Sequence, residues 1–386
     1  MIVPVVLAPP PLSLYVHIPW CVRKCPYCDF NSHQMDGGIP EKIYVAALLK
    51  DLEMALPQVW GRRIESIFFG GGTPSLLSGE ALDEILAGIR LLLPLEPGLE
   101  VTLEANPGAV EAGRFEAYRA AGVNRLSLGI QSFNPRHLKA IGRIHDDHEA
   151  YRAIELAQQS FENINLDLMY ALPGQTQAEA LADIRTAISF RPQHLSAYHL
   201  TIEPNTLFHH HPPILPDDDA SALMQDEIEG LLGGGGYLHY ETSAFSLANH
   251  RCRHNLNYWL FGDYLGIGAG AHGKLSLPDG VVRQTRPRHP QAYMKAIEMG
   301  QPVQDEVRVD PAGLAFEFMM NALRLNDGFR PELFSLRTGL PLSTRNNGLQ
   351  LASDRGLLEQ TDTIIRPTPM GRRFLNDLLA IFLPEE

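Results

Sequence analysis

Short apolar runs alternate with segments of helical periodicity through the first half of the chain. In residues 41–56, for example, Ile43, Ala46, Leu49 and Leu52 recur at helical spacing. The pattern predicts strands at 13–17, 65–69, 99–104, 124–131, 164–170 and 194–200, with helices at 41–56, 79–92, 110–121, 146–160 and 177–190. This alternation predicts an α/β fold with a parallel sheet, which is either curled into a partial barrel or open and doubly wound.

The pattern becomes less regular after residue 204. Residues 217–232 predict a helix, 237–245 predict a strand, and 278–290 are rich in Pro and Arg. Helical periodicity returns at 315–325, 333–338, 345–356 and 369–382, with a short strand at 364–368. We therefore divide the chain into a disordered lead at 1–12, a barrel region at 13–204, an extension at 205–305 and a small, mostly helical C-terminal domain at 306–386.

Composition and charge narrow the classes of function. The chain has 386 residues, of which 45% are hydrophobic, as in an ordinary globular protein. Its formal net charge of -13 argues against a nucleic-acid partner, because nucleic-acid binders cluster Lys and Arg against phosphates. No segment approaches the roughly 18 apolar residues that suggest a transmembrane helix. The apolar N-terminus lacks the basic flank of a secretion signal, and the few cysteines indicate a reducing compartment, so we expect a cytoplasmic protein.

Three of the four cysteines lie directly after the first predicted strand. Cys21, Cys25 and Cys28 have the spacing CxxxCxxC, and Cys252 is isolated. Three thiolates in one turn suit a soft metal, and a four-iron cluster with three cysteine ligands keeps one iron open for another molecule. A disulfide scheme or a zinc site fits less well, because a chain of this length needs no covalent staples and zinc normally takes four protein ligands.

Glycines and polar residues mark the carboxyl ends of several predicted strands. In a barrel, these ends form the functional face. Glycine lets the backbone approach a ligand closely, and a polar side chain within an apolar strand needs a partner. That partner is either a ligand or a neighbouring residue of the barrel. The residues concerned are Gly70, Gly71, Gly72, Glu104 and Gln131 at the strand ends, and Asp167 within the fifth strand.

The cysteine spacing, with an aromatic residue beside it, resembles the signature of the radical S-adenosylmethionine (radical SAM) superfamily. The motifs YVHIP at 15–19, GGGTP at 70–74, GIQSF at 129–133 and DLMYALPGQT at 167–176 further resemble the family that contains oxygen-independent coproporphyrinogen III oxidase and the HemW-type haem chaperones. The resemblance implies a partial (β/α)6 radical SAM barrel followed by a winged-helix-like C-terminal domain. It also implies a [4Fe-4S] cluster on the three clustered cysteines and S-adenosyl-L-methionine (SAM) on the open iron. The residues that match SAM contacts of the family are Tyr15, Tyr27, Gly71, Gly72, Thr73, Glu104, Gln131, Arg143 and Asp167.

A second motif, HNxxYW at 254–259, is similar to one found in HemW-type haem chaperones. The resemblance makes His254 the candidate axial ligand of a haem, with Tyr258 and Trp259 offering flat faces to the porphyrin. In the alternative interpretation, His254 and Asn255 satisfy buried polar groups and the two aromatic residues fill the core. Cys252 is either a haem ligand or an inert buried thiol.

This sequence differs from that of the oxidase in two features that favour a haem chaperone over the oxidase. The oxidase has a further cysteine two places after the third cluster ligand, where this chain has Phe30, and it has a longer segment before its cluster than the twenty residues that precede Cys21. We therefore predict a haem chaperone of porphyrin metabolism that passes haem to acceptor haem proteins, among them proteins of the respiratory chain. The alternatives are an oxygen-independent coproporphyrinogen III dehydrogenase, whose activity we do not expect, and an unrelated radical SAM enzyme.

Overall fold

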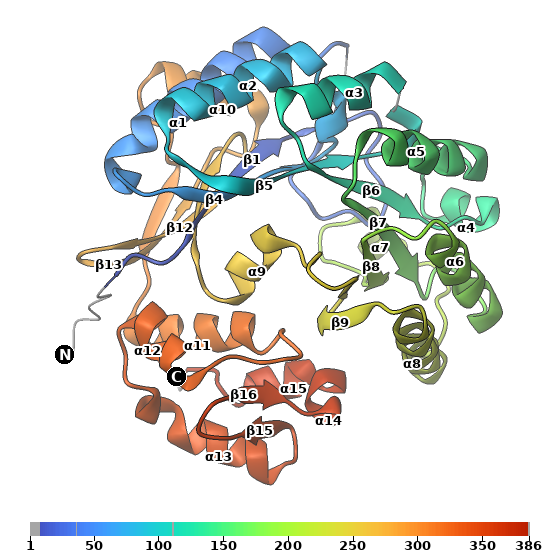
Figure 1. Cartoon of the computed structure of the whole chain (residues 1–386), viewed down its shortest axis with the longest axis vertical. Helices are drawn as coiled ribbons and strands as arrows, with labels where there is room; N and C mark the ends of the chain where they lie inside the picture. The colour runs from blue at the N-terminus through green and yellow to red at the C-terminus, as the bar shows by residue number, and fades with distance from the viewer. Residues whose placement is uncertain (1–7, 36, 110–111, 385–386) are drawn as a thin grey trace.

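A twelve-stranded sheet runs through the middle of the molecule (Figure 1). The computed structural model describes residues 8–35, 37–109 and 112–384, so residues 1–7 of the predicted lead and residues 110–111 of a predicted helix lie outside the described part. The strand order is β14-β13-β12-β11-β1-β4-β5-β6-β7-β8-β10-β9. Its central strands are parallel and follow one another in chain order: β1 (Leu12–Ile18), β4 (Ile64–Gly71), β5 (Leu95–Ala105), β6 (Arg125–Gln131), β7 (Ile164–Tyr170) and β8 (His194–His199).

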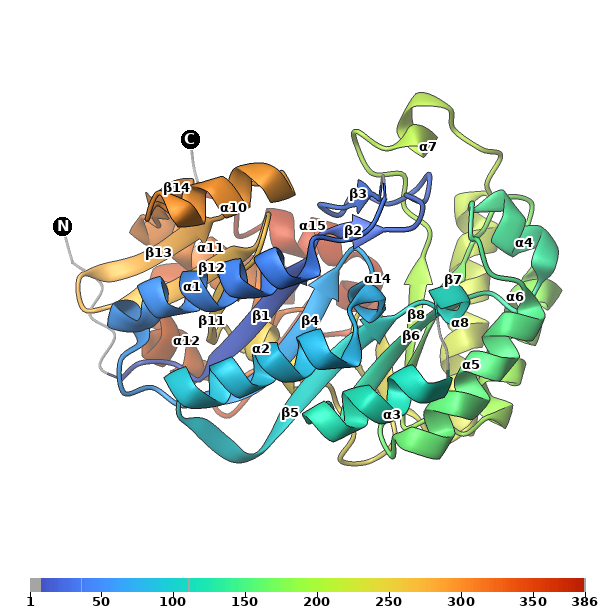
Figure 2. The same cartoon turned by 90° about the horizontal axis from the view of Figure 1, so that it is seen from above.

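The crossover helices decide between the two parallel topologies that the pattern left open. They cover the same face of the sheet (Figure 2). A doubly wound sheet reverses its strand order and has helices on both faces, whereas strands in chain order with helices outside are wound as in a barrel. Within the described residues, β8 pairs with β7 and β10 and not with β1, so the sheet is open. The partial barrel is thus confirmed, with crossover helices α1 (Glu41–Val59), α2 (Gly79–Leu92), α3 (Ala112–Ala121), α4 (Pro135–Ala140), α5 (Asp147–Ser160) and α6 (Gln177–Ser189).

Side-chain caps fix where several of these helices begin. The Ser78 hydroxyl accepts the Ala81 backbone N–H at the start of α2. At the start of α5, Asp146 and Glu149 form a capping box, in which each side chain accepts the other residue's backbone N–H, and α6 begins with the same type of cap. Such caps satisfy backbone donors that the first helical turn leaves unpaired. The helix starts could therefore be predicted to within a residue or two.

The segment 205–305 extends the sheet at both edges. At one edge, β9 (Leu238–Glu241) and β10 (Ala244–Ser246) form a hairpin on β8, so the single strand predicted at 237–245 is wrong. At the other edge, β11 (Asp263–Ile267) pairs in parallel with β1, and β12 (His272–Leu277), β13 (Gly280–Thr285) and β14 (Asp305–Arg308) follow in antiparallel order. The Pro- and Arg-rich segment 278–290 thus contains a strand. The helices of this region are α7 (Leu207–His210), α8 (Asp218–Gly234), α9 (Arg253–Trp259) and α10 (Pro290–Glu298).

Buried ion pairs join the added strands to one another and to the barrel. Lys274 of β12 lies 2.9 Å from Asp263 of β11, and Arg286 lies 3.0 Å from Asp51 of α1. All four side chains are almost fully buried. A buried charge is tolerated where it is paired and hydrogen-bonded. Removing Asp263 would leave the Lys274 charge without its ion-pair partner, and removing Arg286 would do the same to Asp51.

The C-terminal region has a hydrophobic core of its own on the side of the sheet away from α1 and α2 (Figure 1). In this core Phe318 meets both Phe329 and Phe334 edge to face. Phe261 and Val281 of the preceding segment also belong to this core, which ties the two parts together. The elements are α11 (Pro311–Ala322), α12 (Pro331–Thr338), α13 (Asn346–Asp354), the hairpin β15 (Leu358–Gln360) and β16 (Ile365–Pro367), α14 (Pro369–Arg373) and α15 (Leu375–Ala380).

Candidate functional site

The cysteine loop lies beyond the carboxyl ends of the parallel strands, next to α7 (Figure 2). It runs between β2 (Trp20–Cys21) and β3 (His33–Gln34), which pair in parallel and anchor both ends of the loop. All three thiols are free. No group of His, Cys, Asp or Glu side chains among the described residues is arranged to hold a single metal ion. An iron-sulfur cubane differs from a single ion, because it would take one thiolate on each of three irons.

A chain of polar contacts links this loop to the strand ends. The Thr73 hydroxyl donates to the Cys21 sulfur over 3.6 Å, and the Asn106 amide donates to the Thr73 hydroxyl over 3.0 Å. Arg143 donates to Asn106, to the Gly129 carbonyl over 2.6 Å and to the Cys25 sulfur over 3.9 Å. Two predicted site residues, Thr73 and Arg143, are thereby joined to two of the cysteines. Asn106 was missed at the sequence level, although it follows Glu104 at the same strand end.

The glycine run at the end of β4 is required by close packing. At Gly71, φ is +117°, and a Cβ atom would lie 2.6 Å from the His17 ring. At Gly72, a Cβ atom would lie 2.4 Å from the Trp20 carbonyl oxygen, next to the cluster loop. A side chain at Gly71 would displace the His17 ring of β1, and one at Gly72 would push the start of the cysteine loop away from the strand ends. Gly72 therefore sets how closely the cysteine loop lies against the barrel.

Two carboxylates, Glu104 near the end of β5 and Asp167 in the middle of β7, lie close enough to interact electrostatically. Asp167 accepts hydrogen bonds from Ser127 and from Asn165, each over 2.8 Å. The pKa of Glu104 is raised to about 8, mainly by burial and to a lesser extent by the neighbouring Asp167 carboxylate. A hydrogen bond from the Gly71 backbone N–H acts in the opposite direction and lowers this pKa. Burial likewise raises the pKa of Asp167. A cationic ligand group at this place would relieve the cost of holding two negative charges together.

Gln131 and Tyr27 both lie near Arg143. Gln131 has a left-handed φ of 68° at a register shift between β6 and β7. This conformation is uncommon for a residue with a side chain, and such residues concentrate at functional sites. Burial raises the pKa of the Tyr27 hydroxyl, while the nearby Arg143 lowers it, and Tyr27 packs on a small core around Leu172.

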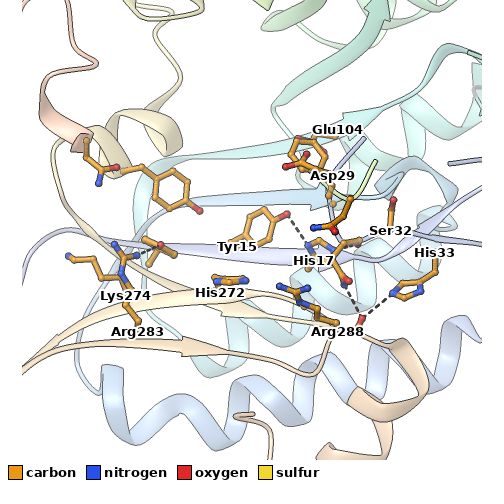
Figure 3. A pocket seen from close by; sticks show the side chains of 18 of the residues that line it. Tyr15, His17, Asp29, Ser32, His33, Glu104, His272, Lys274, Arg283 and Arg288 are labelled. Carbon is orange, nitrogen blue, oxygen red and sulfur yellow. Dashed lines mark hydrogen bonds between the residues drawn. The ribbon is translucent and has the colours of Figure 1, made fainter. Parts of the chain in front are cut away.

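A cavity of about 850 Å³ opens between the strand ends and the β11–β13 edge (Figure 3). Of the predicted SAM contacts, Tyr15, Gly71 and Glu104 line it. Phe30, in the cluster loop, is 61% exposed and also lines it. The volume of the cavity lies in the range of about 300–1,000 Å³ that is usual for small-molecule and cofactor sites.

His254, in the first turn of α9, is not among the residues that line this cavity. Its ring is 1% exposed and stacks on Phe68 with ring centroids 5.0 Å apart. Its Nδ1 is hydrogen-bonded to the Ser66 hydroxyl over 2.9 Å and its Nε2 to the Tyr258 hydroxyl over 3.0 Å, so both nitrogens are engaged. Burial lowers the pKa of His254 to about 3. This geometry matches the alternative in which His254 satisfies buried groups, whereas Tyr258 and Trp259 of the same motif do line the cavity.

Cys252 is fully buried at the start of α9. Its thiol lies 3.6 Å from the Glu100 carboxylate, and burial raises the pKa of this thiol to about 12. A buried thiol that resists ionisation is a poor metal ligand and a poor nucleophile. Of the two interpretations of Cys252, the inert thiol agrees with this environment.

Comparison with known proteins places the chain. Residues 15–187 match the model of the radical SAM superfamily, and residues 309–374 match the HemN C-terminal domain. Two relatives are named "Heme chaperone HemW". The one from Escherichia coli is 50% identical over 97% of this chain and 99% of its own length, and the one from Haemophilus influenzae is 48% identical over 98% and 99%. The chain belongs to the HemW family. Coproporphyrinogen III oxidase (HemN) from Escherichia coli has the same fold, with a TM-score of 0.82 at 21% identity over 97% of this chain and 90% of that one.

Membership in the radical SAM superfamily implies a [4Fe-4S] cluster and SAM, and the residues of the site fit both groups. Three free thiols come from one loop, as a cluster with an open iron needs. The Nε–H group of Arg143 is buried and has no hydrogen-bond acceptor in the described residues, which suits a carboxylate supplied by a ligand. Separately, no helix in residues 8–35, 37–109 or 112–384 is long and apolar enough to cross a membrane.

Proposed function

We propose that the protein is a haem chaperone that binds haem and transfers it to acceptor haem proteins. The observation that carries this proposal is the identity of 50% and 48% to relatives named "Heme chaperone HemW" over almost their whole length. The cavity, with its aromatic lining, supports it, because a porphyrin needs flat apolar contacts. Acceptors of the respiratory chain remain the prediction made above.

In this proposal Cys21, Cys25 and Cys28 hold a [4Fe-4S] cluster, and the strand ends hold SAM. Bound together, these two groups supply one-electron chemistry at the carbon-sulfur bonds of SAM. The chain's own part is positional: Arg143 and Asn106 hold the loop and offer a donor to a carboxylate, and Glu104 offers an acceptor to an ammonium group. Tyr15 lines the same cavity, with its hydroxyl fixed 3.0 Å from His17 Nδ1.

The competing function is oxidative decarboxylation of coproporphyrinogen III. The likeness to the oxidase at 21% identity establishes the fold alone. Phe30, at the place of the oxidase's further cysteine, supports the chaperone. A decisive experiment uses anaerobically reconstituted protein, with haem titration, transfer to the apo form of a respiratory b-type cytochrome and an assay for coproporphyrinogen conversion run side by side. We expect about one haem per chain, transfer to the acceptor and no conversion. Sustained decarboxylation with no haem binding would establish the enzyme instead.

A further inference from the structure

One wall of the cavity is formed by the strands that extend the sheet beyond β1. Lys274 of β12 pairs in register with Arg283 of β13 and with Tyr264 of β11. Side chains two residues apart on a strand share a face, so His272 points to the same side as Lys274. Figure 3 shows His272 along this wall, between Arg283 and Arg288. The wall faces the predicted SAM contacts across the cavity.

His272 is the histidine of this cavity whose ring nitrogens have no partner among the described residues. His17, also in the lining, has both nitrogens engaged, by the Tyr15 hydroxyl over 3.0 Å and by the Asn31 carbonyl over 2.8 Å. His33 is bonded through Nε2 to the Arg288 carbonyl over 3.1 Å. His272 is exposed to the cavity. A histidine with a free ring nitrogen beside an aromatic-lined cavity is placed to ligate a metal carried by a flat ligand.

The cationic side chains of the wall differ in whether they already form an ion pair with a carboxylate of the protein. Lys274 is buried against Asp263, and Arg283 is paired with Glu317. Arg288 is exposed, and its guanidinium forms no ion pair with any described carboxylate. An unpaired guanidinium at the mouth of a cavity can bind a carboxylate through two hydrogen bonds. It is therefore the group of this wall that remains available to an anionic ligand.

Flat and apolar groups complete the cavity. Tyr258, Trp259 and Tyr264 lie in the lining, and Tyr258 meets Tyr264 edge to face at 4.5 Å. Phe30 reaches into the cavity from the cluster loop with 61% of its surface exposed. An exposed aromatic residue in a concave site marks where a ligand packs. Together, a free imidazole, a free guanidinium and aromatic faces match an iron porphyrin that carries carboxylate groups.

Building on the proposed chaperone function, we infer that His272 ligates the iron of the carried haem and that Arg288 binds one of its carboxylates. His254 then has a structural role, since using it as a ligand would break a hydrogen bond of a buried ring. The haem would face the same cavity as the SAM contacts Tyr15 and Glu104. Cargo and cofactor would therefore be neighbours.

The test is a haem titration of the full-length, cluster-loaded protein, read by the Soret band and by electron paramagnetic resonance. His272→Ala should weaken haem binding at least about tenfold, equivalent to about 1.4 kcal/mol, and shift the Soret band. Added imidazole should restore the parent spectrum, which it would not do for a merely structural histidine. Arg288→Ala should weaken binding while leaving the Soret position unchanged. His148→Ala, on the exposed surface of α5, is the matched control and should behave as the parent.

The outcomes separate this assignment from the function on which it rests. If the parent binds haem and His272→Ala binds it with the same affinity and spectrum, the assignment is wrong and the chaperone function stands. If the parent binds no haem, the chaperone function fails and the assignment fails with it. Haem binding that is lost in His254→Ala but kept in His272→Ala, with folding and cluster content normal in both, would return the ligand role to the HNxxYW motif.

Discussion

Replacing Glu104 by Gln should stabilise the protein in a pH-dependent way. The carboxyl group has an ordinary pKa of 4.5, and burial raises it to about 8 in the folded protein. As pH rises between these values, the unfolded chain loses a proton that the folded protein keeps, so the free energy of unfolding falls. Below pH 4.5 the carboxyl group is protonated in both states, so the raised pKa does not lower the free energy of unfolding there. At pH 7 it lowers the free energy of unfolding by at most about 3 kcal/mol. Gln keeps the shape of the side chain and removes the titrating group.

Urea unfolding of Glu104→Gln and of the parent, followed by tryptophan fluorescence at pH 6 and pH 8, measures this effect. We expect the variant to be the more stable protein, with its advantage growing by about 2 kcal/mol between the two pH values. Saturating SAM should reduce the advantage, because its cationic amino group would favour the charged carboxylate of the parent. Glu80→Gln, at an exposed position of α2, is the control. An advantage that is absent, or equal at both pH values, would refute the buried, proton-retaining carboxyl.

Other variants test the cluster loop and its supports. Changing any one of the cysteines in the 21–28 loop to Ala should abolish the roughly four irons and four sulfides of the reconstituted protein, whereas Cys252→Ala should leave them intact; iron and sulfide analysis checks this. Asn106→Ala should remove a charged hydrogen bond from Arg143, which costs on the order of 1.5–3 kcal/mol, and should weaken the effect of SAM on the reduced cluster's electron paramagnetic resonance spectrum without lowering iron content. An unchanged SAM response in both Asn106→Ala and Arg143→Ala would contradict the proposed role of this pair.

The barrel and the cluster loop could be predicted because their signals are local in sequence. Alternation of apolar and polar residues fixes strands and helices over a few turns, and Cys21, Cys25 and Cys28 fall within eight residues. The short strands β9 and β10 were merged into one, because each is shorter than the pattern needs to show a boundary. Strand β13 was missed, because its neighbouring Pro and Arg residues indicate a loop.

The wall of the cavity and the environment of the second motif were decided by tertiary structure alone. His254 was a reasonable haem ligand from its motif, but Ser66, nearly two hundred residues earlier, engages one ring nitrogen, and the ring is buried. His272 attracted no attention in sequence, and it faces the cavity only because β11 pairs with β1 and carries β12 to that edge. The pattern of apolar and polar residues predicts the local structure that a residue forms with its neighbours in sequence. Whether a side chain is buried and bonded or free to bind a ligand depends on contacts between distant residues, which form only when the sheet is assembled.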